Sequence, residues 1–102
     1  MEAVISTMDL RSTVDVSEVE EWAKAALDGL RKEPGFKGLL VLRKGQAPAG
    51  STAYAVTLWE TKERLLAARG TSESQRRLND LVPLLSTPLK QRACQVLLDA
   101  RH

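Results

Sequence analysis

The stretch PGFKGLLVLRKGQAPAGSTAYAVTLWE, residues 34–60, contains two apolar runs separated by a short connection. The first run, Phe36–Lys44, lies between turn-forming residues, which is typical of a buried strand. The second run, Thr52–Glu60, is rich in β-branched and aromatic residues and also predicts a strand. The residues between them, 45–51 (GQAPAGS), predict a loop because glycine and proline interrupt regular structure. Two strands joined by so short a loop are expected to form an antiparallel hairpin.

Before this hairpin, the sequence predicts one strand and one helix. Ala3–Leu10 carries apolar side chains on both alternating faces, as a strand does when both of its faces are covered. Ser17 and Glu20 form a capping-box pair, with Val16 as the apolar staple before the cap. An apolar stripe follows at helical spacing: Val19, Trp22, Ala23, Ala26, Leu27 and Leu30. Pro34-Gly35 is expected to end this helix.

After the hairpin, the sequence predicts two helical stretches. Thr61 caps the first, which runs to Arg69 with Leu65 and Leu66 facing inward, and Gly70 ends it. Ser72, with Gln75 three residues later, begins the second stretch. Its apolar stripe consists of Leu78, Leu81, Val82 and Leu85, and Pro83 should end or kink the helix near Val82.

The last predicted element is a strand at Arg92–Ala100 (RACQVLLDA). The order of elements is therefore β-α-β-β-α-β, which predicts an α+β sandwich with an antiparallel sheet. A length of 102 residues is the common size of one domain, so residues 1–102 are expected to form a single domain.

The predicted strands carry apolar residues on both faces, as Leu40 and Leu42 do against Leu39 and Val41. The helices cover one face, and the chain is too short to add a third layer. We therefore expect a second copy of the chain to cover the other face in a homodimer. The alternative is an exposed apolar sheet, which soluble proteins seldom keep.

Composition and charge exclude several classes of function. The net charge is +2 with both signs interspersed, which argues against a nucleic-acid partner. Arg76 and Arg77, beside Glu73 and Asp80, are expected to form a solvated helix face. Cys94 is the only cysteine, so no disulfide within the chain and no cysteine-rich zinc site can form, and its place in a strand predicts burial.

Neither a signal peptide nor a membrane span is indicated. Residues 1–11 lack a basic start and alternate polar with apolar residues, and no apolar run approaches the ~20 residues that a span requires. A cytoplasmic protein without membrane contact is therefore expected.

Two segments resemble the antibiotic biosynthesis monooxygenase family: PGFKGL (residues 34–39) after an amphipathic helix, and YAVTLWETKE (residues 54–63) leading into a helix. Together with the order of elements, the resemblance covers essentially the whole chain. It implies a ferredoxin-like fold, a sheet that packs against its dimer mate to form a dimeric α+β barrel, and a pocket between sheet and helices. Members of the group include oxygenases that oxidise polycyclic phenols without metal or flavin, and haem-degrading enzymes.

The resemblance places Trp59 in the wall of that pocket, where the indole would stack on an aromatic substrate. The alternative is that Trp59 belongs to the core and anchors the following helix.

Arg69 stands near the position where the haem-degrading relatives have an iron-binding histidine. Those relatives also carry an asparagine in the first strand, where this chain offers Ser6 and Thr7. Arginine neither binds haem iron nor acts as a base near neutral pH, so no cofactor is expected. Its guanidinium could instead stabilise a phenolate or enolate. The alternative is a surface arginine placed favourably near a helix C-terminus.

Tyr54, Thr7 and Thr57 are the other candidate substrate-binding residues. The odd spacing from Tyr54 to Trp59 puts the two rings on opposite faces of the strand, so one could line the pocket while the other packs in the barrel. Tyr54 can donate a hydrogen bond to a ligand oxygen, or be an ordinary half-buried tyrosine. The hydroxyls within apolar strands face either a wet pocket or backbone partners.

His102 is the only histidine and the last residue. A catalytic triad therefore has no plausible base, and a multi-histidine metal site is excluded.

Two hypotheses follow. The first is a cofactor-independent monooxygenase acting on a small aromatic or polyketide-type compound, with Trp59 stacking the substrate and Arg69 stabilising negative charge. The second is a non-catalytic homodimer that binds a small apolar ligand or has a structural role.

Overall fold

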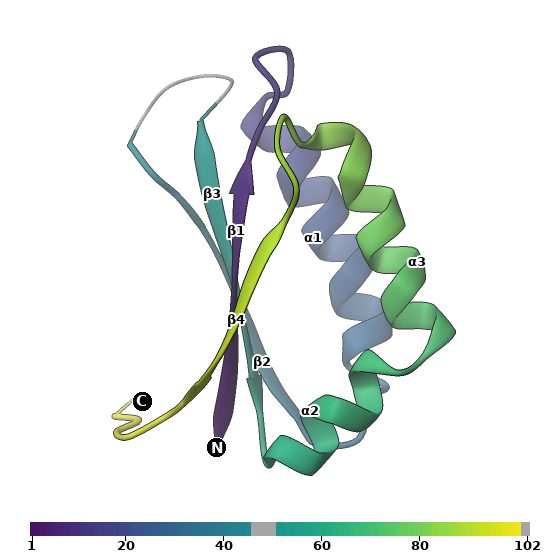
Figure 1. The fold of residues 1–102 in the computed structure, drawn as a ribbon, viewed down its shortest axis with the longest axis vertical. Coiled ribbons are helices and arrows are strands. Elements are labelled where there is room, and N and C mark those ends of the chain that lie inside the picture. The colour runs from purple at the N-terminus through teal and green to yellow at the C-terminus, as the bar shows by residue number, and fades with distance from the viewer. Residues whose placement is uncertain (46–50, 101–102) are drawn as a thin grey trace.

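The structure is a computed structural model that describes residues 1–45 and 51–100. Its elements run in the order β1 (Glu2–Asp9), α1 (Val16–Leu30), β2 (Phe36–Arg43), β3 (Thr52–Trp59), α2 (Lys62–Arg69), α3 (Ser72–Leu81), the short 3₁₀ helix η1 (Val82–Leu84) and β4 (Lys90–Gln95). All strand pairs are antiparallel, in the order β2-β3-β1-β4. Figure 1 shows the helices packed on one side of this sheet. The predicted ferredoxin-like α+β fold is confirmed. Most of the predicted loop and His102 lie outside the described residues.

The last strand is displaced from its predicted position. It covers Lys90–Gln95 and not Arg92–Ala100. Its pairing with β1 ends at Gln95, which lies opposite Glu2. Leu97 and Leu98 therefore extend past the sheet and are almost fully exposed, at 90% and 85%. Their apolar character suggested a strand, but they pair with no strand among residues 1–45 and 51–100.

Two helix caps also differ from the prediction. Asp15 caps α1 in place of Ser17, because its carboxylate accepts hydrogen bonds from the backbone N–H groups of Ser17 and Glu18. The Glu18 carboxylate in turn accepts from the Asp15 backbone N–H at 3.1 Å, which completes a capping box. Thr71 caps α3 in place of Ser72, since its hydroxyl accepts from the Ser74 backbone N–H. Thr61 caps α2 as predicted.

The helix-facing side of the sheet forms the core. Alternate residues of β1 and β3 contribute to it: Val4, Ser6, Met8, Ala53, Ala55 and Trp59 are buried. From the helices, Val19, Ala26, Leu65 and Leu81 pack against them. Leu66 and Val82, both predicted to face inward, are exposed by more than half. Each lies one residue beyond a buried leucine, so the helical rotation of about 100° turns it outward.

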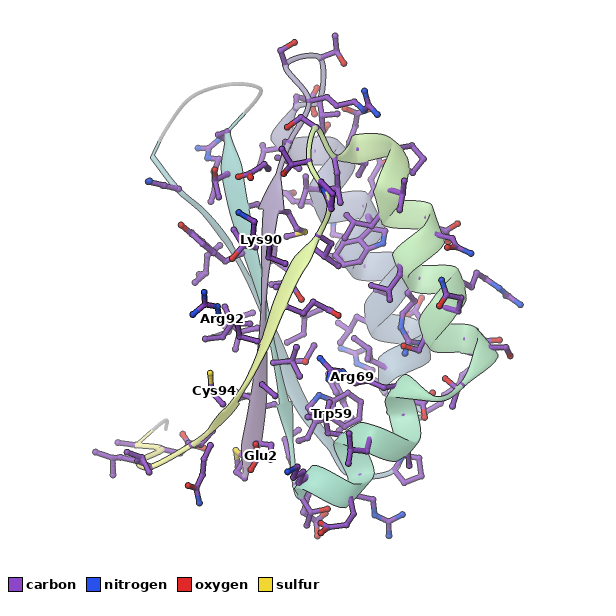
Figure 2. The ribbon with its side chains drawn as sticks, viewed as in Figure 1. Glu2, Trp59, Arg69, Lys90, Arg92 and Cys94 are labelled. Atoms are coloured by element: carbon purple, nitrogen blue, oxygen red, sulfur yellow. The ribbon has the colours of Figure 1, made fainter. Side chains whose placement is uncertain are left out.

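The opposite face of the sheet is not covered in the single chain. Two rows of paired residues cross all four strands: Leu40, Val56, Ile5 and Arg92 in one, and Leu42, Tyr54, Thr7 and Lys90 in the next. We call these two rows the open face. Figure 2 shows Lys90 and Arg92 pointing away from the helices, together with Cys94. Cys94 is exposed, which contradicts its predicted burial.

The turn before β2 fixes how the sheet meets α2. Gly35 has φ +83°, and a Cβ there would lie 2.6 Å from the Cβ and Cγ atoms of Arg64 on α2. The Gly35 carbonyl accepts a hydrogen bond of 2.7 Å from the Glu60 backbone N–H. Phe36 then packs edge-on against Trp59, with ring centroids 5.6 Å apart. A residue with no side chain is needed here because α2 and the end of β3 approach the backbone so closely.

We predict that Gly35→Ala lowers the free energy of unfolding by about 2–3 kcal/mol, because it combines an unfavourable φ with a steric clash. Gly45 is a matched control, since it has φ +71° and a Cβ added there would meet no described atom within 4 Å. Gly45→Ala should cost only about 1 kcal/mol. Urea unfolding of both variants measures the difference. Equal losses would show that the contact with Arg64 does not constrain the turn.

Candidate functional site

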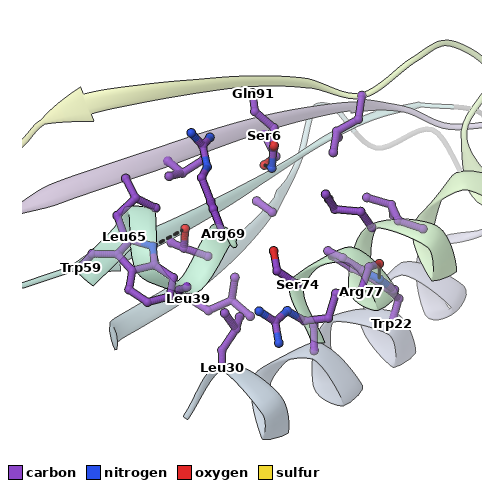
Figure 3. A pocket seen from close by; sticks show the side chains of 18 residues that line it. Ser6, Trp22, Leu30, Leu39, Trp59, Leu65, Arg69, Ser74, Arg77 and Gln91 are labelled. Carbon is purple, nitrogen blue, oxygen red and sulfur yellow. Dashed lines mark hydrogen bonds between the residues drawn. The ribbon is translucent and has the colours of Figure 1, made fainter. Parts of the chain in front are cut away.

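A cavity of about 250 Å³ lies between the helix-facing side of the sheet and the three helices. Its apolar wall comes from Val4, Trp22, Ala26, Leu30, Leu39, Ala55, Trp59, Leu65, Ala68, Leu78, Leu81 and Leu89. Its polar lining consists of Ser6, Thr57, Arg69, Ser74, Arg77 and Gln91 (Figure 3). The volume is slightly below the ~300–1,000 Å³ of ordinary ligand pockets, so it suits a small molecule. Among the described lining residues there is no aspartate or glutamate.

Trp59 forms one end of this pocket. It is the last residue of β3 and is only 3% exposed. Its Nε1–H donates a hydrogen bond of 3.0 Å to the Thr57 hydroxyl, which also lines the pocket. This bond satisfies the buried indole and fixes the orientation of its ring. Trp59 therefore packs in the core and also lines the cavity, and its stacking on a substrate stays a prediction.

Arg69 reaches the pocket from the last turn of α2. In Figure 3 its guanidinium extends from the helix toward β1 and β4. The residue is exposed, so the charge lies where the cavity meets solvent. Within residues 1–45 and 51–100, no ion pair joins Arg69 to an acidic side chain. Its N–H groups are thus available to a bound molecule.

Ser6 and Gln91 form a polar patch on the sheet side of the cavity. They are paired across β1 and β4, and the Gln91 amide donates a hydrogen bond of 3.1 Å to the Ser6 hydroxyl. Ser6 is 9% exposed, so this partner explains how its buried hydroxyl is satisfied. The Ser6 hydroxyl hydrogen remains able to meet a ligand oxygen.

Arg77 is a lining residue that the sequence pattern did not reveal. Arg76 is exposed and pairs with Glu73 at 3.6 Å, as predicted for a solvated face. Arg77, in contrast, is half-buried, and its Nη1 atom is buried with no hydrogen-bond partner among the described residues. The prediction of one solvated basic pair was therefore wrong for Arg77. Arg77 lies three residues after Ser74 and four before Leu81, so all three are on the same side of the helix. This spacing was the signal that Arg77 faces inward.

Trp22 also belongs to the pocket, although the sequence indicated only a core role. Its Nε1–H donates a hydrogen bond of 3.0 Å to the backbone carbonyl of Arg77. This bond ties α1 to α3 at the point where both helices border the cavity. Both tryptophans of the chain consequently line the same pocket.

Tyr54 and Thr7 are not part of this site. They pair with each other across β3 and β1 and lie on the open face, on the far side of the sheet from the cavity. The predicted substrate-binding set is therefore divided: Trp59, Thr57 and Arg69 come together, and Tyr54 and Thr7 do not join them. Strand alternation explains the separation, because Tyr54 and Trp59 are an odd number of residues apart.

Metal ligands are not clustered in the described part of the chain. Residues 1–45 and 51–100 contain no group of three or more histidine, cysteine, aspartate or glutamate side chains that could hold a metal ion. Over the same residues, no helix is long and apolar enough to cross a membrane.

No protein-family model matches the chain, and no curated protein matches it in sequence. Solved structures, however, share its fold over nearly the full length. SnoaB, a cofactor-independent oxygenase from Streptomyces nogalater, superimposes with a TM-score of 0.80 at 11% identity, covering 99% of this chain and 97% of its own. Rv0793 from Mycobacterium tuberculosis gives 0.78 at 18% identity, with 98% of each chain covered.

A candidate antibiotic biosynthesis monooxygenase from Bordetella bronchiseptica gives a TM-score of 0.77 at 17% identity, covering 95% of this chain and 97% of that one. At such low identity the likeness concerns the fold and not the chemistry. The chain has the ferredoxin-like fold of the antibiotic biosynthesis monooxygenase-like proteins.

Proposed function

We propose that this protein is a cofactor-independent monooxygenase that acts on a small aromatic or polyketide-type compound in the pocket between sheet and helices. The observation that carries the proposal is the pocket itself. There an oriented indole, Trp59, and a guanidinium without an ion pair among the described residues, Arg69, border one apolar cavity. SnoaB, which has the same fold, is a cofactor-independent oxygenase.

The chemistry requires little from the protein beyond binding and charge stabilisation. A phenol can react with O₂ at a ring C–H to give a quinone and water. One oxygen atom forms the new C=O bond, the O–O bond breaks, and the other oxygen leaves as water with the hydrogens of the ring C–H and the phenol O–H, so the substrate supplies all four electrons that reduce O₂. The reactive species is the phenolate, whose negative charge is delocalised onto ring carbon. Trp59 would hold the ring flat by stacking, and Arg69 would stabilise the phenolate oxygen. The apolar wall excludes water from the reacting carbon.

A non-catalytic role is the second candidate, and one observation favours it. The described residues that line the pocket include neither a carboxylate nor an imidazole, so the protein offers no evident general base. Under this alternative the same pocket binds a small apolar molecule without changing it. A substrate that is already ionised near neutral pH would remove the need for a base and reconcile the site with catalysis.

We further propose that the protein is a homodimer in which the open face of one copy packs on that of the other. Leu40 and Leu42 of β2 are about half exposed, at 52% and 49%, and Ile5 of β1 is 37% exposed. Val56 of β3 is paired between Leu40 and Ile5. These residues form one continuous apolar surface over β2, β3 and β1, and burying it provides the driving force for association. In a two-fold symmetric dimer, each copy contributes the same surface to the contact. The open face can do this because its apolar part is contiguous. A cytoplasmic location remains a prediction from the sequence.

The enzymatic proposal predicts oxygen consumption by the purified protein, stripped of metal and flavin, with at least one member of a panel of electron-rich phenols and quinols. Arg69→Ala should slow the reaction by about 100-fold, the usual loss when one donor to a developing oxyanion is removed. Arg76→Ala is the matched control, because this exposed arginine lies outside the pocket and should leave the rate unchanged. An oxygen electrode provides the measurement.

Unchanged turnover in Arg69→Ala would remove Arg69 from the mechanism. If no phenol or quinol is oxidised and apolar compounds nevertheless raise the melting temperature, the binding role is correct and the enzymatic one is wrong.

The dimer proposal predicts that Leu40→Glu dissociates the protein, because it places a charge of the same sign from each copy in the apolar part of the contact. Leu66→Glu is the control, since Leu66 is similarly exposed, at 54%, but lies on α2. Sedimentation velocity at micromolar concentration should give twice the chain mass of 11.2 kDa for the wild type and Leu66→Glu, and the single mass for Leu40→Glu. A Leu40→Glu protein that sediments as the wild type does would contradict this interface.

A further inference from the structure

We infer that the molecule bound in this pocket carries a permanent negative charge, and that Arg77 is the residue that binds its acidic group. The inference rests on the proposed function, because it names the class of molecule for the same pocket. It gives a role to Arg77, which the proposed reaction does not use. Arg69 would stabilise the phenolate oxygen, and Arg77 would bind a separate acidic group.

The surroundings of Arg77 leave its charge unbalanced. Its Nη1 atom is buried, and the described residues offer it no hydrogen-bond partner. No ion pair joins it to an acidic side chain within residues 1–45 and 51–100, and no described lining residue of the pocket is acidic. Buried donors are nearly always satisfied, and a donor on a cation most of all, so this atom requires an explanation. The protein closes off Nη1 itself, so an acidic group in the cavity would pair with the other guanidinium N–H groups of Arg77, which lines the cavity, and would balance the charge.

The guanidinium of Arg77 packs against the neighbouring helix, α1. A Cβ on Gly29 of α1 would lie 3.0 Å from Arg77 Nη1, so the guanidinium lies directly against the backbone of that helix. α1 has no basic residue in its own last turn, and the partial negative charge at its C-terminus stabilises a cation there. This contact explains why the charge is tolerated in a largely apolar wall. It does not satisfy the hydrogen-bonding capacity of a group with five N–H donors.

The two arginines lie on different sides of the cavity. In Figure 3 the Arg69 guanidinium points toward the sheet, and the Arg77 guanidinium points toward Leu30 of α1. The exposed Arg69, close to solvent, is suited to stabilise a substrate oxygen whose negative charge changes during the reaction. The half-buried Arg77, with the Ser74 hydroxyl also in the lining, is suited to a fixed acid group. Planar donors in a fork match a carboxylate in two-point geometry.

The ligand class that follows is a flat aromatic carboxylate: apolar rings against Trp22 and Trp59, and one acid group at Arg77. Such a molecule complements both properties of the cavity, its apolar wall and its surplus of positive charge. A neutral hydrocarbon of the same shape would leave the Arg77 donors unpaired and would bind less tightly.

The test compares 2-naphthoate with 2-naphthamide, which has the same rings and nearly the same shape but no charge. Isothermal titration calorimetry of the wild-type protein should show naphthoate binding roughly tenfold or more tightly, the gain expected for a charge-assisted hydrogen bond. Arg77→Gln should abolish this preference, and Arg77→Lys, which keeps the charge without the planar fork, should keep part of it. Arg76→Gln is the matched control, one residue away with the same change in net charge, and should retain the full preference.

A preference for naphthoate that survives in Arg77→Gln would overturn the inference. The inference would also fail if the wild-type protein bound the two compounds equally, or bound neither at millimolar concentration. The outcome is separable from that of the oxygen assays. If the preference depends on Arg77 but no phenol is oxidised, the inference stands and the enzymatic proposal fails. If phenols are oxidised but the preference does not depend on Arg77, the inference alone fails.

Discussion

A four-stranded sheet that is apolar on both faces, with helices on only one of them, is the constraint on which the rest of this structure depends. Val4 and Met8 of β1 are buried under the helices, while Ile5 between them is exposed on the other side. Within residues 1–45 and 51–100, no helix lies over Ile5 and its neighbours. The two faces consequently differ: one encloses the pocket, and the other is the surface on which we propose that a second copy packs.

The pocket exists because the helix-facing layer is incompletely filled. Three of its lining residues, Ala26, Ala55 and Ala68, are buried alanines, each 4% exposed. Leucine at such positions would close the space, as close packing in protein interiors normally does. Large rings, those of Trp22 and Trp59, are held instead at the border of the cavity, each by one hydrogen bond. Small residues in the wall and oriented aromatic rings at its edge support the proposal that this cavity binds a small molecule.

Periodicity in the sequence was enough to predict the order of elements, the hairpin of β2 and β3, and the opposite orientations of Tyr54 and Trp59. Periodicity was not enough where contact with a distant segment of the same chain determines the structure. The apolar residues after Gln95 look like a strand, but the pairing of β4 with β1 ends at Gln95, opposite Glu2. Arg77 looks like the solvated Arg76, and only the approach of α1 at Gly29 reveals that its Nη1 atom is enclosed. Both errors arise from tertiary contacts that a local pattern does not contain.

The division of the sheet into a ligand face and a partner face can be tested with the only three indole or phenol groups of the chain, Trp22, Trp59 and Tyr54. In an NMR titration with 2-naphthoate, both indole N–H signals should shift, because both tryptophans line the pocket, and the ring signals of Tyr54 should stay in place. Signals of Tyr54 that move with the ligand while the indole signals do not would contradict this account, because they would place the binding site on the open face.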